Sequence, residues 1–258
     1  MVTPLVLGVP LLLGGALGFS GGMFGIGGGI VAVPVLTTFF GMDQKMAQGT
    51  ALVMMVPNLV IALWRYHQRQ PLPLRHTLPV ALCAMVTTAI TAHFASGLDS
   101  AFLRRCFGLF LLWLACYSGW RLYAQSRPAQ TEAPSRWHVV LPERLLPLVG
   151  ILGGACSGLL GIGGGIIATP IFAGWFRQRQ VIAQGFALAL VTPSTGVALA
   201  TYAHVGYVSW GIGLALAVGG MGLVSSGVRL AHRLPETRLR SAFAALLGVT
   251  AVWMVAGH

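Results

Sequence analysis

The sequence is poor in charge: 8% of its 258 residues are charged, and only five are acidic. Soluble domains usually carry about 25% charged residues. Because 56% of the residues are hydrophobic, the chain has too few charges to cover a soluble core. The 16 Lys and Arg give a formal charge of +11, but they lie in short loops between apolar runs, without RNA-type motifs or a basic tail. We therefore expect an integral membrane protein and no nucleic-acid partner.

The motifs of catalytic and metal sites are missing as well. The four cysteines occur without a CxxC pair or a metal-ligand spacing, so we interpret them as small buried hydrophobic residues. There is no HExxH motif, and no two carboxylates lie within the apolar segments. We expect no enzyme, no catalytic residue, no metal and no cofactor. No charge precedes Asp43, so the N-terminus lacks the positive region of a signal peptide and is expected to belong to the mature first segment.

What the sequence does contain is a duplicated glycine-rich block. Residues 21–34 read GGMFGIGGGIVAVP, and residues 157–170 read SGLLGIGGGIIATP. A shift of 136 residues aligns the two halves of the chain without a gap, with ten of nineteen positions identical between 18–36 and 154–172. The same shift matches Gln48 to Gln184 and, further on, one helix proline to another. The chain is therefore a duplication of the kind that is typical of secondary transporters.

Each half contains four apolar segments, and the first of each is unusually long. The segments cover 4–40, 46–64, 77–95 and 101–123, then 144–176, 181–203, 208–231 and 239–256. A spanning helix needs about 20 apolar residues. The first runs, with 37 and 33 residues, are too long for one straight span. Each is either a long broken helix or a hairpin that turns back near the glycines.

The basic residues favour the hairpin. If each long run crosses the membrane once, the 16 basic residues divide nine to seven, which gives the positive-inside rule no preference. If each run returns to its starting side, thirteen face three, and the three are Lys45, Arg104 and Arg105. We predict an all-α integral membrane protein with two inverted-topology repeats and both termini outside. Each repeat has a Gly-broken re-entrant or hairpin first segment and three transmembrane helices.

This topology divides the chain into three parts. We predict repeat 1 over residues 1–124, a cytoplasmic linker over 125–142 and repeat 2 over 143–258, which together form one membrane domain.

The glycines predict where a ligand would bind. A helix broken at membrane depth survives only where it is packed in protein or lines a wet cavity. The break leaves N–H groups free at the start of the second half-helix, and a helix N-terminus attracts anions. Glycine also lets a ligand approach the backbone. Two inverted repeats would bring two such termini together near the midplane. The alternative is that the glycines only allow close helix packing. A nucleotide site is excluded, because Ile30 and Ile166 replace the third glycine of its motif.

The doubled block that ends in proline, followed by Gln-Gly on the next segment, resembles the sulfite exporter (TauE/SafE) family of membrane permeases, and the resemblance covers essentially the whole chain. It implies a bacterial inner-membrane protein that moves sulfur-containing anions such as sulfite and organosulfonates. The expected partners are therefore a small anion and the lipid bilayer; a homo-oligomer is left open.

Polar residues in the apolar segments complete the prediction. Gln48 and Gln184 either donate to a bound oxyanion or cap carbonyls of the broken helix, because a buried amide needs a partner. Thr50 follows Gln48, whereas Phe186 stands at its counterpart, and Asn58 and Ser194 occupy equivalent positions after a proline. The predicted substrate-binding residues are Gly25, Gly27, Gly28, Gly29, Gln48, Thr50, Asn58, Gly161, Gly163, Gly164, Gly165, Gln184 and Ser194.

Other polar and aromatic residues have simpler interpretations. We expect the hydroxyls of Thr192 and Thr195 to bond back to helix carbonyls near Pro193. Aromatic residues at segment ends are expected to form interfacial belts. They are Trp64, Tyr66, Trp120, Tyr123, Tyr202 and Tyr207.

The expected function is that of a secondary transporter for small anions that works by alternating access. The alternatives are a passive anion channel and a membrane assembly or signalling subunit that transports nothing. The anion, the direction of transport and the coupling ion stay open.

Overall fold

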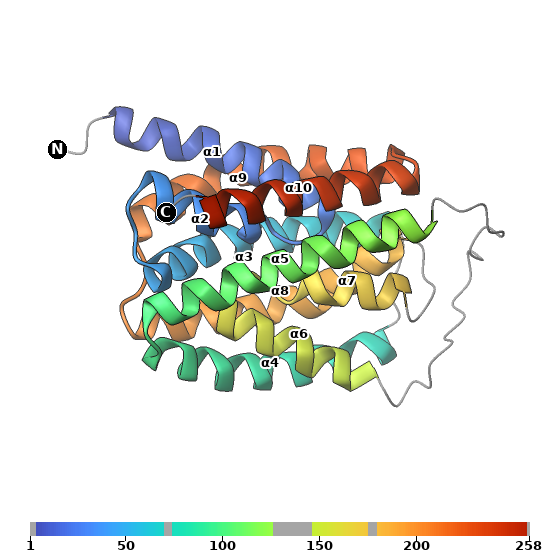
Figure 1. Ribbon diagram of the computed structural model, residues 1–258, viewed down its shortest axis with the longest axis horizontal. Helices are drawn as coiled ribbons and strands as arrows, with labels where there is room; N and C mark the ends of the chain where they lie inside the picture. The colour runs from blue at the N-terminus through green and yellow to red at the C-terminus, as the bar shows by residue number, and fades with distance from the viewer. Residues whose placement is uncertain (1–3, 70–73, 126–145, 175–179, 257–258) are drawn as a thin grey trace.

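The computed structural model describes residues 4–69, 74–125, 146–174 and 180–256, and every regular element in this part of the chain is an α-helix. The helices lie roughly along the long axis of the molecule (Figure 1). Their bounds are α1 Pro4–Phe24, α2 Gly29–Phe39, α3 Gln44–Arg69, α4 Leu74–Gly97, α5 Ser100–Gln125, α6 Leu146–Leu160, α7 Gly165–Gly174, α8 Gln180–His204, α9 Trp210–Arg233 and α10 Glu236–Ala256. The predicted linker over 125–142 lies, apart from its first residue, outside the described residues.

The two long apolar runs break at the glycines, as the sequence predicts. Between α1 and α2 the chain turns through Gly25, Gly27 and Gly28, with φ angles of 68°, 70° and 86°. Between α6 and α7 it turns through Gly161 and Gly163, with φ angles of 63° and 67°. Left-handed backbone of this kind costs other L-residues about 1–2 kcal/mol each, which explains why glycine stands there.

Five helices in the described residues are long and apolar enough to cross a membrane, namely α3, most of α4, the first 18 residues of α5, most of α8 and all of α9. In the most apolar 18-residue window of each helix, 67% of the residues in α3 and 61% of those in α8 are buried, against 28–39% in the other three helices. Two central helices are therefore surrounded by helices with an apolar outer face. Large side chains on that face include Leu12, Phe94, Leu109, Trp113 and Val249, which are 58–77% exposed. Such a surface suits lipid.

The molecule has two distinguishable ends (Figure 1). The first turn of α1 and the last turn of α10 lie together at one end, which we call the terminal end. The last turn of α5 and the first turn of α6 lie at the other, the linker end. α2 returns from the first break toward the terminal end, where α3 begins, and α7 returns from the second break toward the linker end.

Helices of the two halves exchange partners through glycine contacts. On α1, Gly14, Gly18 and Gly22 pack against the backbone of Leu216, Gly220 and Val224 on α9. On α6, Gly150, Gly154 and Gly158 pack in the same way against Val80, Ala84 and Thr88 on α4. Adding 136 to each residue number on α1 and subtracting 136 from each residue number on α9 converts the first set of contacts into the second. Both pairs are parallel, because residue numbers rise together along them.

The interpretation of the cysteines as buried residues was wrong for Cys116 and holds only in part for the other three. All four cysteines are free thiols, and Cys116 is exposed while Cys83, Cys106 and Cys156 are half-buried. Cys106 packs against the hydrophobic core, whereas Cys116 on the same helix α5 is exposed.

Candidate functional site

The two glycine breaks lie against each other in the middle of the molecule. A Cβ built on Gly29, the first residue of α2, would lie 3.2 Å from the Cα of Ile162 in the second break. A Cβ built on Gly165, the first residue of α7, would lie 3.2 Å from the carbonyl oxygen of Gly25. The starts of both half-helices therefore face the opposite break, and the first-turn amides of such helices have no intrahelical partner.

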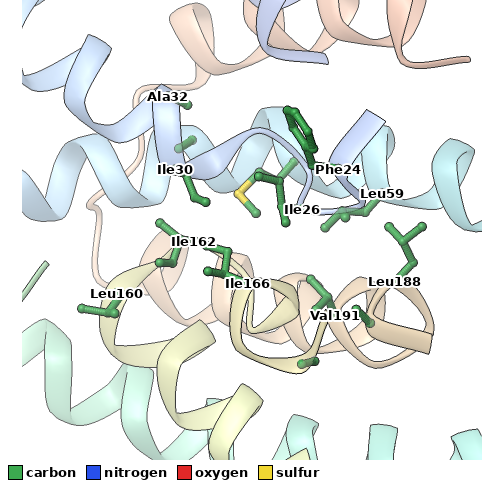
Figure 2. Packing of buried hydrophobic residues seen from close by; sticks show 14 of the residues in the cluster. Phe24, Ile26, Ile30, Ala32, Leu59, Leu160, Ile162, Ile166, Leu188 and Val191 are labelled. Carbon is green, nitrogen blue, oxygen red and sulfur yellow. The ribbon is translucent and has the colours of Figure 1, made fainter. Parts of the chain in front are cut away.

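Isoleucines fill the contact between the breaks. Figure 2 shows Ile26 and Ile30 on one side and Ile162 and Ile166 on the other, with their side chains turned toward the contact. All four are at most 1% exposed. The centre is thus apolar and closely packed in this conformation, so a passing solute requires the two breaks to separate.

Two tyrosine–glutamine hydrogen bonds connect the halves. Tyr66 at the end of α3 donates to Oε1 of Gln184 on α8 at 2.8 Å. Tyr202 at the end of α8 donates to Oε1 of Gln48 on α3 at 3.0 Å. The second bond is the first shifted by 136 positions. All four side chains are at most 1% exposed. Because each tyrosine occupies the carbonyl oxygen, each glutamine is left with its NH₂ group to offer.

Each glutamine lies beside the glycine break of the other half. A Cβ on Gly25 would lie 3.1 Å from Cβ of Gln184, and a Cβ on Gly161 would lie 2.7 Å from Cβ of Gln48. The Nε2 atoms of both glutamines are buried and have no hydrogen-bond partner among the described residues. An unmet buried donor costs about 1–3 kcal/mol. These two donors are therefore suited to a ligand that supplies an acceptor.

The glutamines lie at different depths. Met55 of α3 and Val191 of α8 both reach Gly163, so these two residues mark a common level. Gln48 and Gln184 each precede that level by seven residues, or about 10 Å of helix. Because α3 and α8 run in opposite directions, Gln48 lies toward the terminal end and Gln184 toward the linker end. The predicted pair thus belongs to two equivalent units on either side of the centre.

Thr50 lies apart from these units. Its buried hydroxyl oxygen accepts a hydrogen bond of 3.0 Å from the backbone amide of Ser209, just before α9. Its adjacent residue Gly49 packs closely on the carbonyl oxygen of Tyr207. This places Thr50 at a helix junction of the terminal end.

Asn58 and Ser194 occupy equivalent positions with different partners. The amide of Asn58 is fully buried against Gly220 of α9, and neither of its polar atoms has a hydrogen-bond partner among the described residues. The hydroxyl of Ser194 donates to the carbonyl of Val191 at 3.0 Å. Of these two, Asn58 retains unused polar atoms.

Most of the predicted glycines pack closely against protein. Sites for a Cβ on Gly27, Gly28, Gly163 and Gly164 are occupied by Leu59, by the Leu17 carbonyl, by Val191 and by the Gly153 backbone. The packing interpretation, left open by the sequence, fits these positions. Gly29 also packs against protein, because a Cβ there would meet Sδ of Met55, whereas the nearest atom to a Cβ on Gly165 is the carbonyl oxygen of Gly25 at 3.2 Å.

Tyr66 and Tyr202 were missed, and their assignment to an aromatic belt was wrong. They are 1% and 0% exposed, whereas Trp64 and Trp120 are 55% and 68% exposed. A signal was present in the sequence, because the 136-residue shift places Tyr66 on Tyr202.

The threonines beside Pro193 follow the expectation in part. Thr192 donates to the carbonyl of Leu188 at 2.7 Å, which confirms its back-bonding. The prediction for Thr195 was wrong, because its buried hydroxyl has no partner in the described part of the chain; it lies 3.3 Å from a Cβ built on Gly163. Its neighbour Ser194 makes the back-bond instead.

Fold and site together define a multi-pass helical membrane protein with a buried glutamine amide on each side of an apolar centre, its NH₂ group unpartnered within the described residues. A family model described as sulfite exporter TauE/SafE matches residues 10–254. The chain therefore belongs to the sulfite exporter TauE/SafE family.

Three similar proteins are each described as a probable membrane transporter protein. The first, from Methanocaldococcus jannaschii, is 27% identical over 97% of this chain and 96% of its own length. The second, from Xylella fastidiosa strain Temecula1, is 27% identical over 94% and 92%. The third, from Haemophilus influenzae, is 25% identical over 95% and 96%. These names and the family indicate a membrane transporter rather than an enzyme.

Proposed function

We propose that this protein transports small anions, with sulfite or organosulfonates as the leading class, across the bacterial inner membrane by alternating access of two inverted repeats. The family description and the names of the relatives support the transport class. The buried amide donors on either side of the centre support a negatively charged or oxygen-rich cargo.

The repeated contacts support the inverted repeats. The exchange of α1 onto α9 and of α6 onto α4, together with the two Tyr–Gln hydrogen bonds, relates the halves by the same 136-residue shift. Repeat 1 begins at the terminal end and repeat 2 at the linker end. Of the 11 basic residues in the described part of the chain, all but Lys45, Arg104 and Arg105 then belong to the linker end, which we assign to the cytoplasm.

The single observation that carries the substrate class is the pair of buried glutamine NH₂ groups without a partner. The positive ends of α2 and α7 add backbone donors and partial charge at the centre. The described residues place no carboxylate beside either glutamine, so the polar groups that meet there favour an anion. We assign the bound anion to the half-helix N-termini, with one Tyr–Gln unit on each side of it.

Alternating access follows from this arrangement. The isoleucine contact closes the centre, and each Tyr–Gln bond ties α3 to α8 on one side of it. Breaking one bond while keeping the other opens a path to one end only. Outward movement of an anion is favoured by an inside-negative potential, by about 2.3 kcal/mol per charge per 100 mV.

The test is flux of sulfite or a sulfonate in proteoliposomes. Replacing both Gln48 and Gln184 by leucine is expected to lower flux at least tenfold, because the buried donors are removed. Ser241→Leu, at an exposed polar residue of α10 outside both Tyr–Gln units, is the control. Wild-type-like flux in the double variant rejects the site. Flux of no oxyanion by the wild-type protein rejects the transport assignment.

A channel and a carrier differ in their response to gradients. A coupled carrier accumulates its substrate against a gradient when a driving ion gradient is applied, and counterflow of labelled sulfite accelerates when unlabelled sulfite is present on the opposite side. A passive channel shows neither effect.

A further inference from the structure

A cavity of about 210 Å³ opens at the linker end between the last turns of α3 and α9. It is lined by Arg65, Gln68, Arg69, Ser225, Val228 and Arg229. Half of these residues are arginines, and no carboxylate is among them. Guanidinium groups bind oxyanions through paired hydrogen bonds, so the lining has the chemistry of an oxyanion site.

Two of the arginines are held in place by neighbours. Nη2 of Arg229 donates to Oγ of Ser226 at 3.0 Å. The guanidinium of Arg65 lies 4.8 Å from the centre of the Trp64 ring. Such contacts reduce the side-chain freedom that an exposed arginine otherwise loses on binding.

The cavity lies directly outside one of the Tyr–Gln units. Tyr66 belongs to the same turn of α3 as Arg65 and Arg69, and it points inward to Gln184. Its ring packs on His232, 4.7 Å between ring centres. Nδ1 of His232 lies 2.9 Å from the carbonyl oxygen of Val228, which lines the cavity. One layer of side chains therefore separates the cavity from the buried unit.

The arginines break the internal symmetry of the protein. Shifting Arg65, Arg69 and Arg229 by 136 positions gives Thr201, Val205 and His93. The buried tyrosines and glutamines are thus the same at both ends, whereas the arginine-lined mouth exists at the linker end alone among the described residues. The general excess of basic residues at the linker end explains why the charges there are positive. It does not explain why three arginines surround one cavity.

We propose that this cavity captures the small oxyanion substrate at the linker end before it passes Tyr66 and Gln184. The proposal rests on the anion transport proposed above and adds where the anion is first bound and from which side of the membrane it enters. A cavity needs only about 10–15 Å³ to hold one water, so a cavity of about 210 Å³ is large enough for an oxyanion with part of its hydration shell. Capture on one side raises the local anion concentration there and favours transport from that side at low concentration.

The test compares Arg69→Gln plus Arg229→Gln with Arg233→Gln plus Arg238→Gln. Both pairs remove two charges at the linker end, but only the first pair lines the cavity. Sulfite flux is measured from each side in proteoliposomes of known protein orientation. In the first pair we expect the half-saturating sulfite concentration at the linker side to rise about tenfold, with the maximal flux unchanged. We expect unchanged saturation from the terminal side, which also reports correct folding.

Several results overturn the proposal. If the control pair raises the half-saturating sulfite concentration at the linker side equally, general surface charge and not the cavity causes the change. An effect in vesicles that contain phosphatidylglycerol, but none in pure phosphatidylcholine, assigns the cavity to a lipid headgroup. Unchanged saturation in the first pair rejects capture while leaving transport intact.

A separate titration distinguishes this proposal from the transport assignment. Calorimetric binding of sulfite to the detergent-purified Gln48→Leu plus Gln184→Leu variant is expected to persist, and adding the Arg69 and Arg229 substitutions is expected to abolish it. This outcome supports the cavity as an oxyanion site even if flux fails. If sulfite binds the variant with all four substitutions as tightly as it binds the Gln48→Leu plus Gln184→Leu variant, the cavity is not an oxyanion site.

Discussion

Replacing Gly161 with alanine strains the second glycine break in two ways. The residue has φ of 63°, and left-handed backbone costs alanine about 1–2 kcal/mol. The added Cβ would lie 2.7 Å from Cβ and 3.0 Å from Cγ of Gln48, so the break or the glutamine must move. Overpacking of this kind costs about 1–3 kcal/mol. We expect a total loss of about 2–5 kcal/mol, together with displacement of the Gln48 amide.

Two other substitutions separate these contributions. Gly25→Ala has nearly the same backbone strain, with φ of 68°, but its Cβ meets Gln184 no closer than 3.1 Å. Its cost should therefore be the smaller of the two. Gly196→Ala lies within α8 with nothing within 4 Å of the added Cβ. Alanine is favoured over glycine inside a helix by about 0.5–1 kcal/mol, so this variant should be neutral or stabilised.

Thermal unfolding of the purified proteins and sulfite flux in proteoliposomes measure both effects. The expected order for apparent Tm and for flux is Gly196→Ala highest, Gly25→Ala intermediate and Gly161→Ala lowest. If Gly161→Ala is as stable and as active as Gly196→Ala, the break does not hold Gln48 in the way that the structure describes.

The remaining predictions concern the hydroxyls and the glycine contacts. Tyr66→Phe leaves Oε1 of Gln184 without its donor, which costs about 1–3 kcal/mol, so flux should fall severalfold. The control is Tyr207→Phe, at a half-buried tyrosine outside both units, and its flux should stay near wild type. Equal flux in the two variants contradicts a role for the bond. Gly18→Val drives a side chain into the backbone of Gly220, whereas Gly8→Val on the same helix meets open space. Gel filtration should therefore show loss of the folded protein for Gly18→Val alone, and two equally well-folded variants argue against the α1–α9 contact.

The positions of the breaks could be predicted from the sequence because their cause is local. Glycine is the residue that accepts positive φ without cost, and Gly25, Gly27, Gly161 and Gly163 have such angles. The length of the apolar runs excludes one straight span, and the distribution of basic residues then favours a return of the chain. The placement of Gln48 and Gln184 beside the breaks also agrees with the alignment of the two halves.

The partners of these residues could not be predicted, because they depend on contacts between distant segments. Local position suggests that Tyr66 is interfacial, since it follows Trp64 at the end of an apolar run, yet the crossing of α3 and α8 buries it. Nothing near Thr50 indicates that Ser209, 159 positions later, would take its hydroxyl oxygen. The depth difference between the two glutamines likewise follows from the antiparallel crossing of their helices.

The exchange of helices between the halves has a consequence for how the protein is made. Gly14 on α1 packs against Leu216, which is 202 positions later in the chain. At a synthesis rate of about 5–20 residues per second, the glycine face of α1 waits about 10–40 s for α9 to emerge from the ribosome. During that time the glycine face of α1, which later packs against α9, is either covered by an insertase or membrane chaperone or exposed to lipid.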